Sequence, residues 1–180
     1  MKYMLISDIH GSETSLIKAL EAFRQMKYDY LLILGDILYF GPRNSIPEGL
    51  NPKGVAALLN HISDKVIAIR GNCDAEVDQM LLDFPCMSDY ALIMDEGKRL
   101  FLTHGHVYNE EIQPKGHFDF FFYGHTHLWK LEKKNDTVVC NVGSITFPKG
   151  GNLPTFAVYE KGRLSIHSLV DYSLLAEIEK

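Results

Sequence analysis

The sequence lacks the features that mark a disulfide-stapled, secreted or membrane-spanning protein. It has three cysteines, an odd number with no CxxC spacing. No apolar run approaches the ~20 residues that a membrane span requires. The first residues lead straight into a short apolar stretch, without a signal-peptide pattern. We therefore expect a protein of the reducing cytoplasm that forms no disulfide and does not contact a membrane.

The sequence also lacks clusters of charged residues of one sign. The chain has 18 basic and 23 acidic residues, a formal charge of −5, and its Lys and Arg form no stripe. Because long nucleic acid is bound mainly through neutralised phosphates, we expect no such partner. The sequence contains no repeat, linker or low-complexity segment either. Its 180 residues therefore predict a single domain spanning 1–180.

The apolar pattern alternates between the periods of strands and helices. Short apolar runs at 3–6, 30–34 and 66–69 alternate with helical spacing around 16–23 and 51–62. After a short helix near 75–82, the pattern predicts strands at 91–94, 100–103, 118–123, 129–133, 138–140, 156–159 and 164–169. Ten or so short strands exceed one sheet of ordinary size. The predicted fold is therefore α/β, with two mixed β-sheets packed as a sandwich and flanked by helices.

Polar side chains gather where five of the predicted strands end. They are Asp8 and His10, then Asp36, then Asn72 and Asp74, then His104 and His106, and finally His125 and His127. Glycines at 11, 35, 71, 105 and 124 permit tight turns beside them. Ligands of an open α/β sheet bind at the carboxyl ends of its strands, so we expect the five clusters to converge.

The residue types indicate a metal site. Carboxylate, amide and imidazole groups suit Mn, Fe, Zn and similar divalent ions. Seven candidate ligands are too many for one tetrahedral ion, whereas two ions ~3.5–4 Å apart that share a carboxylate would use them all. The pattern therefore favours a dinuclear centre.

The five clusters resemble the motifs of the calcineurin-like metallophosphoesterase superfamily, in the family's order, from about residue 3 to 145. The Gly-Asn-Cys-Asp block at 71–74, the segment 41–49 and the segment 148–151 are similar to the YfcE-like subgroup of bacterial phosphodiesterases. The resemblance implies an αββα metallophosphoesterase fold. It also implies in-line attack on phosphorus by a hydroxide that bridges two metals.

The resemblance further implies a ligand set. Asp8, His10, Asp36 and His127 would hold the first metal, and Asp36, Asn72, His104 and His125 would hold the second, with Asp36 bridging the two. Manganese is the first expectation for both ions, and nickel, iron, zinc and cobalt are alternatives. Asp74 is expected to orient a ligand histidine from behind.

One position departs from the pattern of many superfamily members. Cys73 stands where they carry a histidine, and a thiol of pKa ~8.5 is a weaker proton donor than an imidazole of pKa ~6.5. We hypothesise that His106 partly supplies the missing group; the alternative is a hydrogen-bonded structural histidine. The candidate catalytic residues are therefore Asn72, Cys73, Asp74 and His106. A preference for aryl leaving groups, which need no protonation, should follow.

Two cations are candidates for substrate binding. Arg43 and Lys149 lie in loops rich in Gly and Pro, where each could bind a phosphate or be a solvated surface charge.

The predicted function is metal-dependent hydrolysis of small phosphodiesters. The alternatives are a phosphomonoesterase or nuclease with the same metals, and a non-catalytic scaffold like the retromer subunit that shares this fold. A homodimer or homotetramer is compatible with the resemblance. Neither the substrate nor the metal is specified by these residues.

Overall fold

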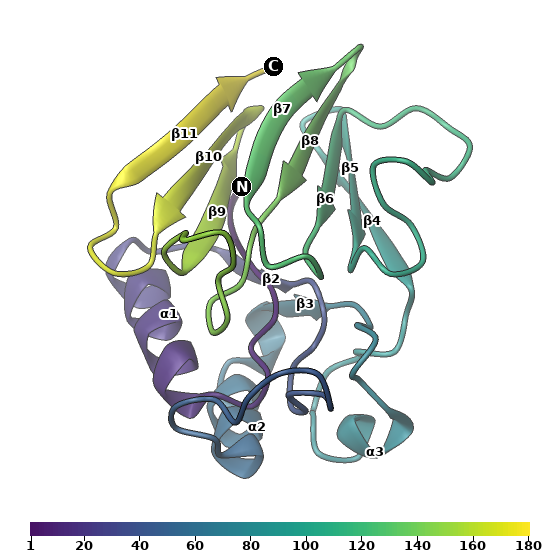
Figure 1. Cartoon of the computed structure of the whole chain (residues 1–180). Helices are drawn as coiled ribbons and strands as arrows, with labels where there is room; N and C mark the ends of the chain where they lie inside the picture. The colour runs from purple at the N-terminus through teal and green to yellow at the C-terminus, as the bar shows by residue number, and fades with distance from the viewer.

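The computed structural model describes residues 1–180, and its eleven strands form two sheets packed face to face (Figure 1). The six-stranded sheet has the order β11-β10-β9-β1-β2-β3. Its strands are β1 (Lys2–Ile6), β2 (Tyr30–Ile33), β3 (Val66–Ala68), β9 (Thr155–Glu160), β10 (Arg163–Ser168) and β11 (Leu174–Glu179). β1, β2 and β3 are parallel, and β9 to β11 form an antiparallel meander beside β1.

The five-stranded sheet has the order β4-β5-β6-β8-β7. Its strands are β4 (Tyr90–Asp95), β5 (Lys98–Thr103), β6 (Phe120–Tyr123), β7 (Lys130–Lys134) and β8 (Thr137–Asn141). β5, β6 and β8 are parallel, while β4 and β7 are antiparallel edges. Both sheets are therefore mixed, as predicted.

Two apolar layers hold the molecule together. Between the sheets lies a core that includes Leu5, Phe122 and Tyr159. A larger core lies between the six-stranded sheet and the helices α1 (Glu13–Gln25) and α2 (Pro52–Asn60). The start of each helix is fixed by its sequence. Ser12 caps α1 and Asn51 caps α2, each accepting a hydrogen bond from a free backbone N–H of the first turn.

The helices α1 and α2 cover the outer face of the six-stranded sheet, and no long helix covers the other sheet. The outer face of the five-stranded sheet is covered by an aromatic cluster in which Phe101 and Phe121 are joined by Phe118 and Tyr108 from the connection between β5 and β6. The predicted strand at 118–123 accordingly begins at Phe120. The remaining helices are short, with α3 spanning Glu76–Gln79 and a 3₁₀ turn, η1, spanning Ser63–Lys65.

The strand β11 was not predicted. It is an edge strand whose apolar and polar residues alternate only from Ala176 to Glu179, and its first two residues, Leu174 and Leu175, are exposed. No helix has the length and apolar character needed to cross a membrane.

Candidate metal centre

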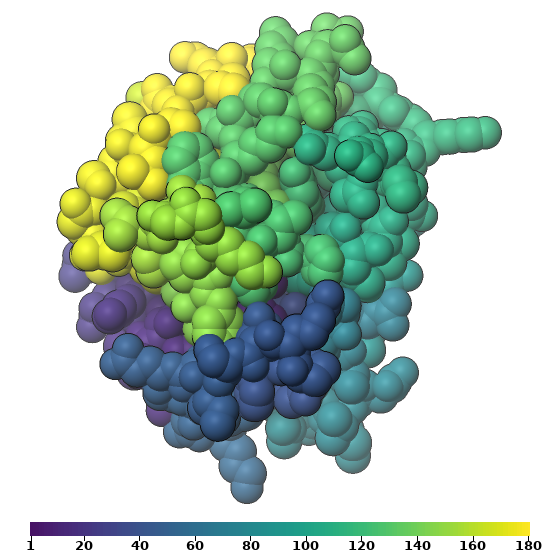
Figure 2. Space-filling view, in the orientation of Figure 1, coloured from purple at the N-terminus to yellow at the C-terminus, as the bar shows by residue number.

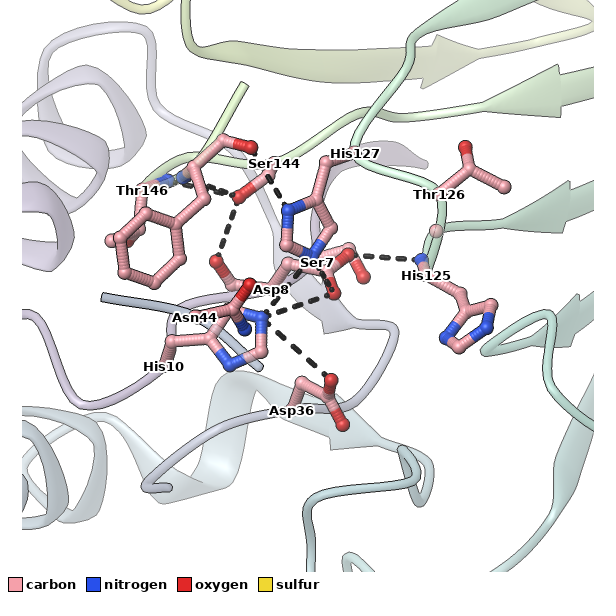
Figure 3. A network of polar contacts seen from close by, with 12 residues as sticks. Ser7, Asp8, His10, Asp36, Asn44, His125, Thr126, His127, Ser144 and Thr146 are labelled. Carbon is pink, nitrogen blue, oxygen red and sulfur yellow. Dashed lines mark hydrogen bonds and ion pairs between the residues drawn. The ribbon is translucent and has the colours of Figure 1, made fainter. Parts of the chain in front are cut away.

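Three buried side chains meet just beyond the ends of β1 and β6 (Figure 3). Asp8 Oδ1 lies 3.1 Å from His127 Nε2 and 3.4 Å from His10 Nε2, and the two nitrogens are 3.2 Å apart. This carboxylate oxygen is buried yet accepts no hydrogen bond of good geometry. Ligand atoms ~2.0–2.2 Å from one ion lie ~3–3.6 Å from one another. The three atoms therefore fit a shared divalent cation.

A second group adjoins the first. Asp36 Oδ2 lies 3.7 Å from His10 Nε2 on one side and 3.5 Å from His104 Nε2 on the other. Asn72 Oδ1 lies 3.1 Å from the same His104 nitrogen. Asp36 therefore stands between two sets of donor atoms, which is the place that a bridging carboxylate requires.

His125 joins the cluster mainly through its backbone. Its N–H donates a hydrogen bond to Asp8 Oδ2 at 3.0 Å, and its ring packs edge-on against His104 with centroids 5.1 Å apart. In Figure 3 the imidazole of His125 points away from His10 and His127. All seven predicted ligands thus gather at one end of the sandwich, with His125 on the His104 side.

Backbone carbonyls orient three of the histidines. The contacts are His10 Nδ1 to Tyr39 O at 3.1 Å, His104 Nδ1 to Leu34 O at 2.6 Å, and His127 Nδ1 to Phe147 O at 2.9 Å. An Nδ1–H that donates to a carbonyl leaves Nε2 with a free lone pair, and all three Nε2 atoms face the carboxylates. The neutral tautomer that a metal needs is therefore set by the main chain.

Asp74 does not orient a histidine, and that prediction is wrong. Its carboxylate accepts hydrogen bonds from the backbone N–H groups of Asp36 and Ile37 at 2.8 Å, and of Gly71 at 2.7 Å. Burial raises the pKa of Asp74 to about 6. The side chain joins the loops after β2 and β3, because it is the acceptor for three buried backbone N–H groups of those loops.

The backbone at the cluster is unusual. Five predicted ligands have left-handed conformations, namely Asp8 (φ 58°), His10 (φ 52°), Asp36 (φ 56°), His125 (φ 65°) and His127 (φ 61°). Such conformations cost ~1–3 kcal/mol each and persist where surrounding structure over-determines them. Of the neighbouring glycines, Gly11, Gly35 and Gly105 also have positive φ values, of 72°, 90° and 118°, so glycines and ligands turn the chain together. Gly71 has another use, because a Cβ there would overlap Asp36.

Two hydroxyl groups that the sequence analysis did not assign also support the cluster (Figure 3). Ser144 Oγ donates to the carbonyl of Asp8 at 3.0 Å, and Thr146 Oγ1 donates to the carbonyl of Ile9 at 2.8 Å. They hold the left-handed Asp8 segment from the far side. Hydrogen bonds to a distant main chain leave no pattern in the sequence that could have revealed them.

The carboxylates stay ionised despite their burial. Burial alone would raise the pKa of Asp8, but the adjacent His10 and His127 imidazoles lower it below its usual value. Burial likewise opposes ionisation of Asp36, and His104 lowers its pKa. The same contacts raise the pKa of His10 and raise that of His104 to about 9, so these imidazoles carry Nε2 protons when no metal is bound. A divalent cation at this donor set would replace those protons.

A cavity of about 770 Å³ opens onto this cluster. Arg43 and Lys149, the two cations predicted to bind phosphate, are both exposed and line it together with Asn72 and Cys73. Burial, reinforced by the charge of Asp36, raises the pKa of the Cys73 thiol to about 12.

His106 does not line the cavity. Its ring packs against His104 with centroids 5.3 Å apart, and its Nδ1 is buried without a hydrogen-bond partner. Burial, together with His104, lowers the pKa of His106. The side chain therefore stands behind a predicted ligand.

The chain belongs to the calcineurin-like phosphoesterase superfamily, whose domain profile matches residues 1–162. The family implies a bound divalent metal, and the donor atoms described above fit one.

Among its relatives is the phosphodiesterase YfcE of Escherichia coli K12, which is 46% identical over 179 residues, covering 99% of this chain and 97% of YfcE. The solved structure of YfcE, described as a phosphoesterase, superimposes with a TM-score of 0.96 at 44% identity and covers 99% of both chains. The α/β fold with two mixed sheets is therefore confirmed.

A more distant structure shares the fold alone. Vps29 from Entamoeba histolytica, solved with zinc, has a TM-score of 0.65 at 17% identity and covers 99% of both chains.

Proposed function

We propose that this protein is a metal-dependent phosphodiesterase that hydrolyses small phosphodiesters. The observation that carries the proposal is the position of Asp36 between the donor atoms of His10 and His104, at 3.7 and 3.5 Å. The similarity to the phosphodiesterase YfcE, which spans 99% of this chain, supports the same activity. When bound, two divalent ions supply an activated water and neutralise the oxygens of the phosphate.

The proposed ligand set is the predicted one. Asp8, His10, Asp36 and His127 hold one ion, and Asp36, Asn72, His104 and His125 hold the other. The contacts of Asp8 with His10 and His127 support the first group, and the contacts of His104 with Asp36 and Asn72 support the second. Manganese is the metal we expect first.

Arg43 and Lys149 bind the substrate phosphate in this proposal. Both are exposed in the cavity above the cluster. The Lys149 main chain is held close to the centre, because its N–H donates to the carbonyl of His127 at 3.0 Å. Cationic side chains in that position offset the charge that a phosphodiester brings.

His106 acts through its neighbours rather than by touching the substrate. Its contact with His104 and its place outside the cavity support a positioning role. Proton donation to the leaving group then falls to water or to Cys73, so aryl diesters should react faster than alkyl diesters. If His106→Ala leaves kcat on an aryl diester unchanged at saturating metal, this role is excluded.

The decisive experiment uses metal-stripped protein titrated with Mn²⁺ in the presence of an aryl phosphodiester and the matching monoester. We expect turnover that rises with metal and favours the diester. Asp36→Asn should abolish turnover and metal binding, whereas Asp171→Asn, on the exposed turn before β11, should change neither.

Each alternative predicts a different result. Preference for the monoester would identify a phosphomonoesterase. Metal binding without turnover on any ester would identify a scaffold, and turnover on single-stranded DNA above that on small diesters would identify a nuclease.

A further inference from the structure

One aromatic side chain stands apart from the rest of the cavity wall. Tyr39 is the only Phe, Tyr or Trp that lines the cavity above the metal cluster, and it is 47% exposed. Its neighbours in the wall are predicted metal ligands, the cations Arg43 and Lys149, and small residues, of which Pro42 and Ala75 are apolar. Almost half of this residue stays in contact with solvent, although burial of an aromatic side chain removes ~150–250 Å² of surface from water.

The backbone that carries the ring is held at a fixed place. Ile37 and Leu38, which precede it, are buried in the core. The Tyr39 carbonyl accepts the hydrogen bond from His10 Nδ1 at 3.1 Å, so its backbone is anchored to a predicted metal ligand. Phe40 packs beside it with ring centroids 5.2 Å apart. With the backbone anchored, only the side-chain torsions of Tyr39 have to be ordered when a ligand binds, which limits the entropy lost.

The same loop brings a cation to the cavity. Asn44 Nδ2 donates to the carbonyl of Phe40 at 2.6 Å, which turns the chain back so that Arg43 also lines the wall. In Figure 2 the surface near residue 40, in indigo, and the surface near residue 150, in yellow-green, lie on one face of the molecule. A flat apolar ring and a positive charge on one short loop match a ligand with a planar ring attached to a phosphate.

From this arrangement we infer that Tyr39 is a stacking platform for a planar aromatic group of the substrate, either an aryl ring or a nucleobase. The inference rests on the proposed phosphodiesterase function and narrows its substrates to aromatic or nucleoside phosphodiesters. Stacking on a tyrosine face tolerates any planar ring. It therefore discriminates against diesters whose substituents are all alkyl.

A second exposed tyrosine supplies the matched control. Tyr90 on β4 is 51% exposed, but its ring stacks on Phe101 with centroids 5.2 Å apart and lies outside the cavity. It has similar exposure and a different environment. A general effect of removing a surface tyrosine would appear in both variants.

The test measures binding, so it does not depend on turnover. Three phosphonates, whose P–C bonds resist hydrolysis, are titrated by calorimetry into the Mn²⁺-loaded protein: methylphosphonate, phenylphosphonate and an acyclic nucleoside phosphonate. For each protein we compare the Kd of methylphosphonate with the Kd of each aromatic compound, and the ratio of the two is the measured quantity. We expect a ratio of about ten for the wild type, the size of one stacking contact.

The variants identify the residue responsible. Tyr39→Leu keeps apolar bulk without a π face and should bring the ratio close to one. Tyr39→Phe and Tyr90→Leu should each keep the wild-type ratio. A larger ratio for the nucleoside compound would assign the platform to a nucleobase, and a larger ratio for the phenyl compound would assign it to an aryl ester.

Two results would overturn the inference: a wild-type ratio near one, or a Tyr39→Leu ratio equal to that of the wild type. Failure of the proposed function looks different. In that case the Mn²⁺-loaded protein would turn over no diester, whatever the ratio of its binding constants.

Discussion

The metal cluster and the hairpin turns at the other end of the sandwich both contain left-handed backbone, for different reasons. At the opposite end of the sandwich from the metal cluster, Glu96, Asn135 and Lys161 adopt φ values of 48°, 53° and 49° in exposed hairpin turns. At the cluster, Asp8 and Asp36 adopt 58° and 56° while buried. The turns carry local signals such as Glu-Gly and Lys-Gly, whereas the ligand loops are held by distant partners.

The difference lies in the hydrogen bonds. The Asp8 N–H donates to Gly35 O at 3.2 Å and the His10 N–H to Asp36 O at 2.9 Å, so the loops after β1 and β2 hold each other. The Asp36 N–H in turn donates to Asp74. Removing one hydrogen-bonding partner at the cluster should therefore destabilise several loops at once. Removing a residue from one hairpin turn should destabilise that turn alone.

The largest effect is expected for Asp74→Ala. Three buried backbone N–H groups would lose their acceptor at ~1–3 kcal/mol each, so the free energy of unfolding should fall by about 4 kcal/mol. Urea denaturation of the metal-free protein measures it. Asn135→Ala, at a left-handed turn position, should cost about 1 kcal/mol. Equal losses in the two variants would show that Asp74 does not hold the loops together.

A smaller loss of stability is expected for a substitution that acts only by steric overlap. A Cβ on Gly71 would overlap the backbone N and side chain of Asp36, so Gly71→Ala should cost about 3 kcal/mol and weaken Mn²⁺ binding. Gly97, in the turn between β4 and β5, has φ 79° and open space around its Cβ position. Gly97→Ala should cost about 1 kcal/mol and leave Mn²⁺ binding unchanged. Chemical denaturation and metal titration of both variants test the pair, and unchanged Mn²⁺ affinity in Gly71→Ala would contradict it.

The smallest effect concerns the turn between β10 and β11, where Tyr172 is also left-handed. His167 Nδ1 contacts the Tyr172 carbonyl at 3.2 Å, and burial lowers the pKa of His167 from its ordinary value of 6.5. Because the folded state disfavours the charged imidazole, its stabilising contribution is complete above the unfolded pKa. That contribution is lost as pH falls through 6.5 towards the folded pKa.

The stability of the wild type relative to His167→Gln should therefore decrease between about pH 7.5 and about pH 5. Thermal denaturation of both proteins across this range measures the difference. Parallel curves for the two proteins would show that His167 is not disfavoured in its charged form.

Much of the fold could be predicted, for reasons that particular elements illustrate. β1, β2 and β3 are buried parallel strands that appear as short apolar runs, and α2 starts at the predicted Asn51 and Pro52. β11 was missed, because its alternation covers only Ala176 to Glu179 and the two leucines that precede it are exposed. Nor could the aromatic cover of the five-stranded sheet, since Tyr108 and Phe118 lie in an irregular connection.

The candidate ligands were also predictable, because carboxylates and imidazoles cluster after apolar strands whose carboxyl ends share one edge. The groups that orient these ligands could not be predicted. The carbonyls of Leu34, Tyr39 and Phe147 orient histidines far from them in sequence, and no side-chain type marks a carbonyl for that purpose. Asp74 was assigned to the wrong partner for the same reason.

The sequence by itself determined the family, the two mixed sheets and the identity of the side chains that could bind metal, because strand periods and residue types are local properties. The tertiary structure alone decided which imidazole nitrogen faces the carboxylates, what holds the left-handed Asp8 and Asp36, and which aromatic ring is left uncovered beside the cavity. Those features depend on hydrogen bonds and contacts between segments far apart in the chain, and such contacts exist only after the sheets have packed.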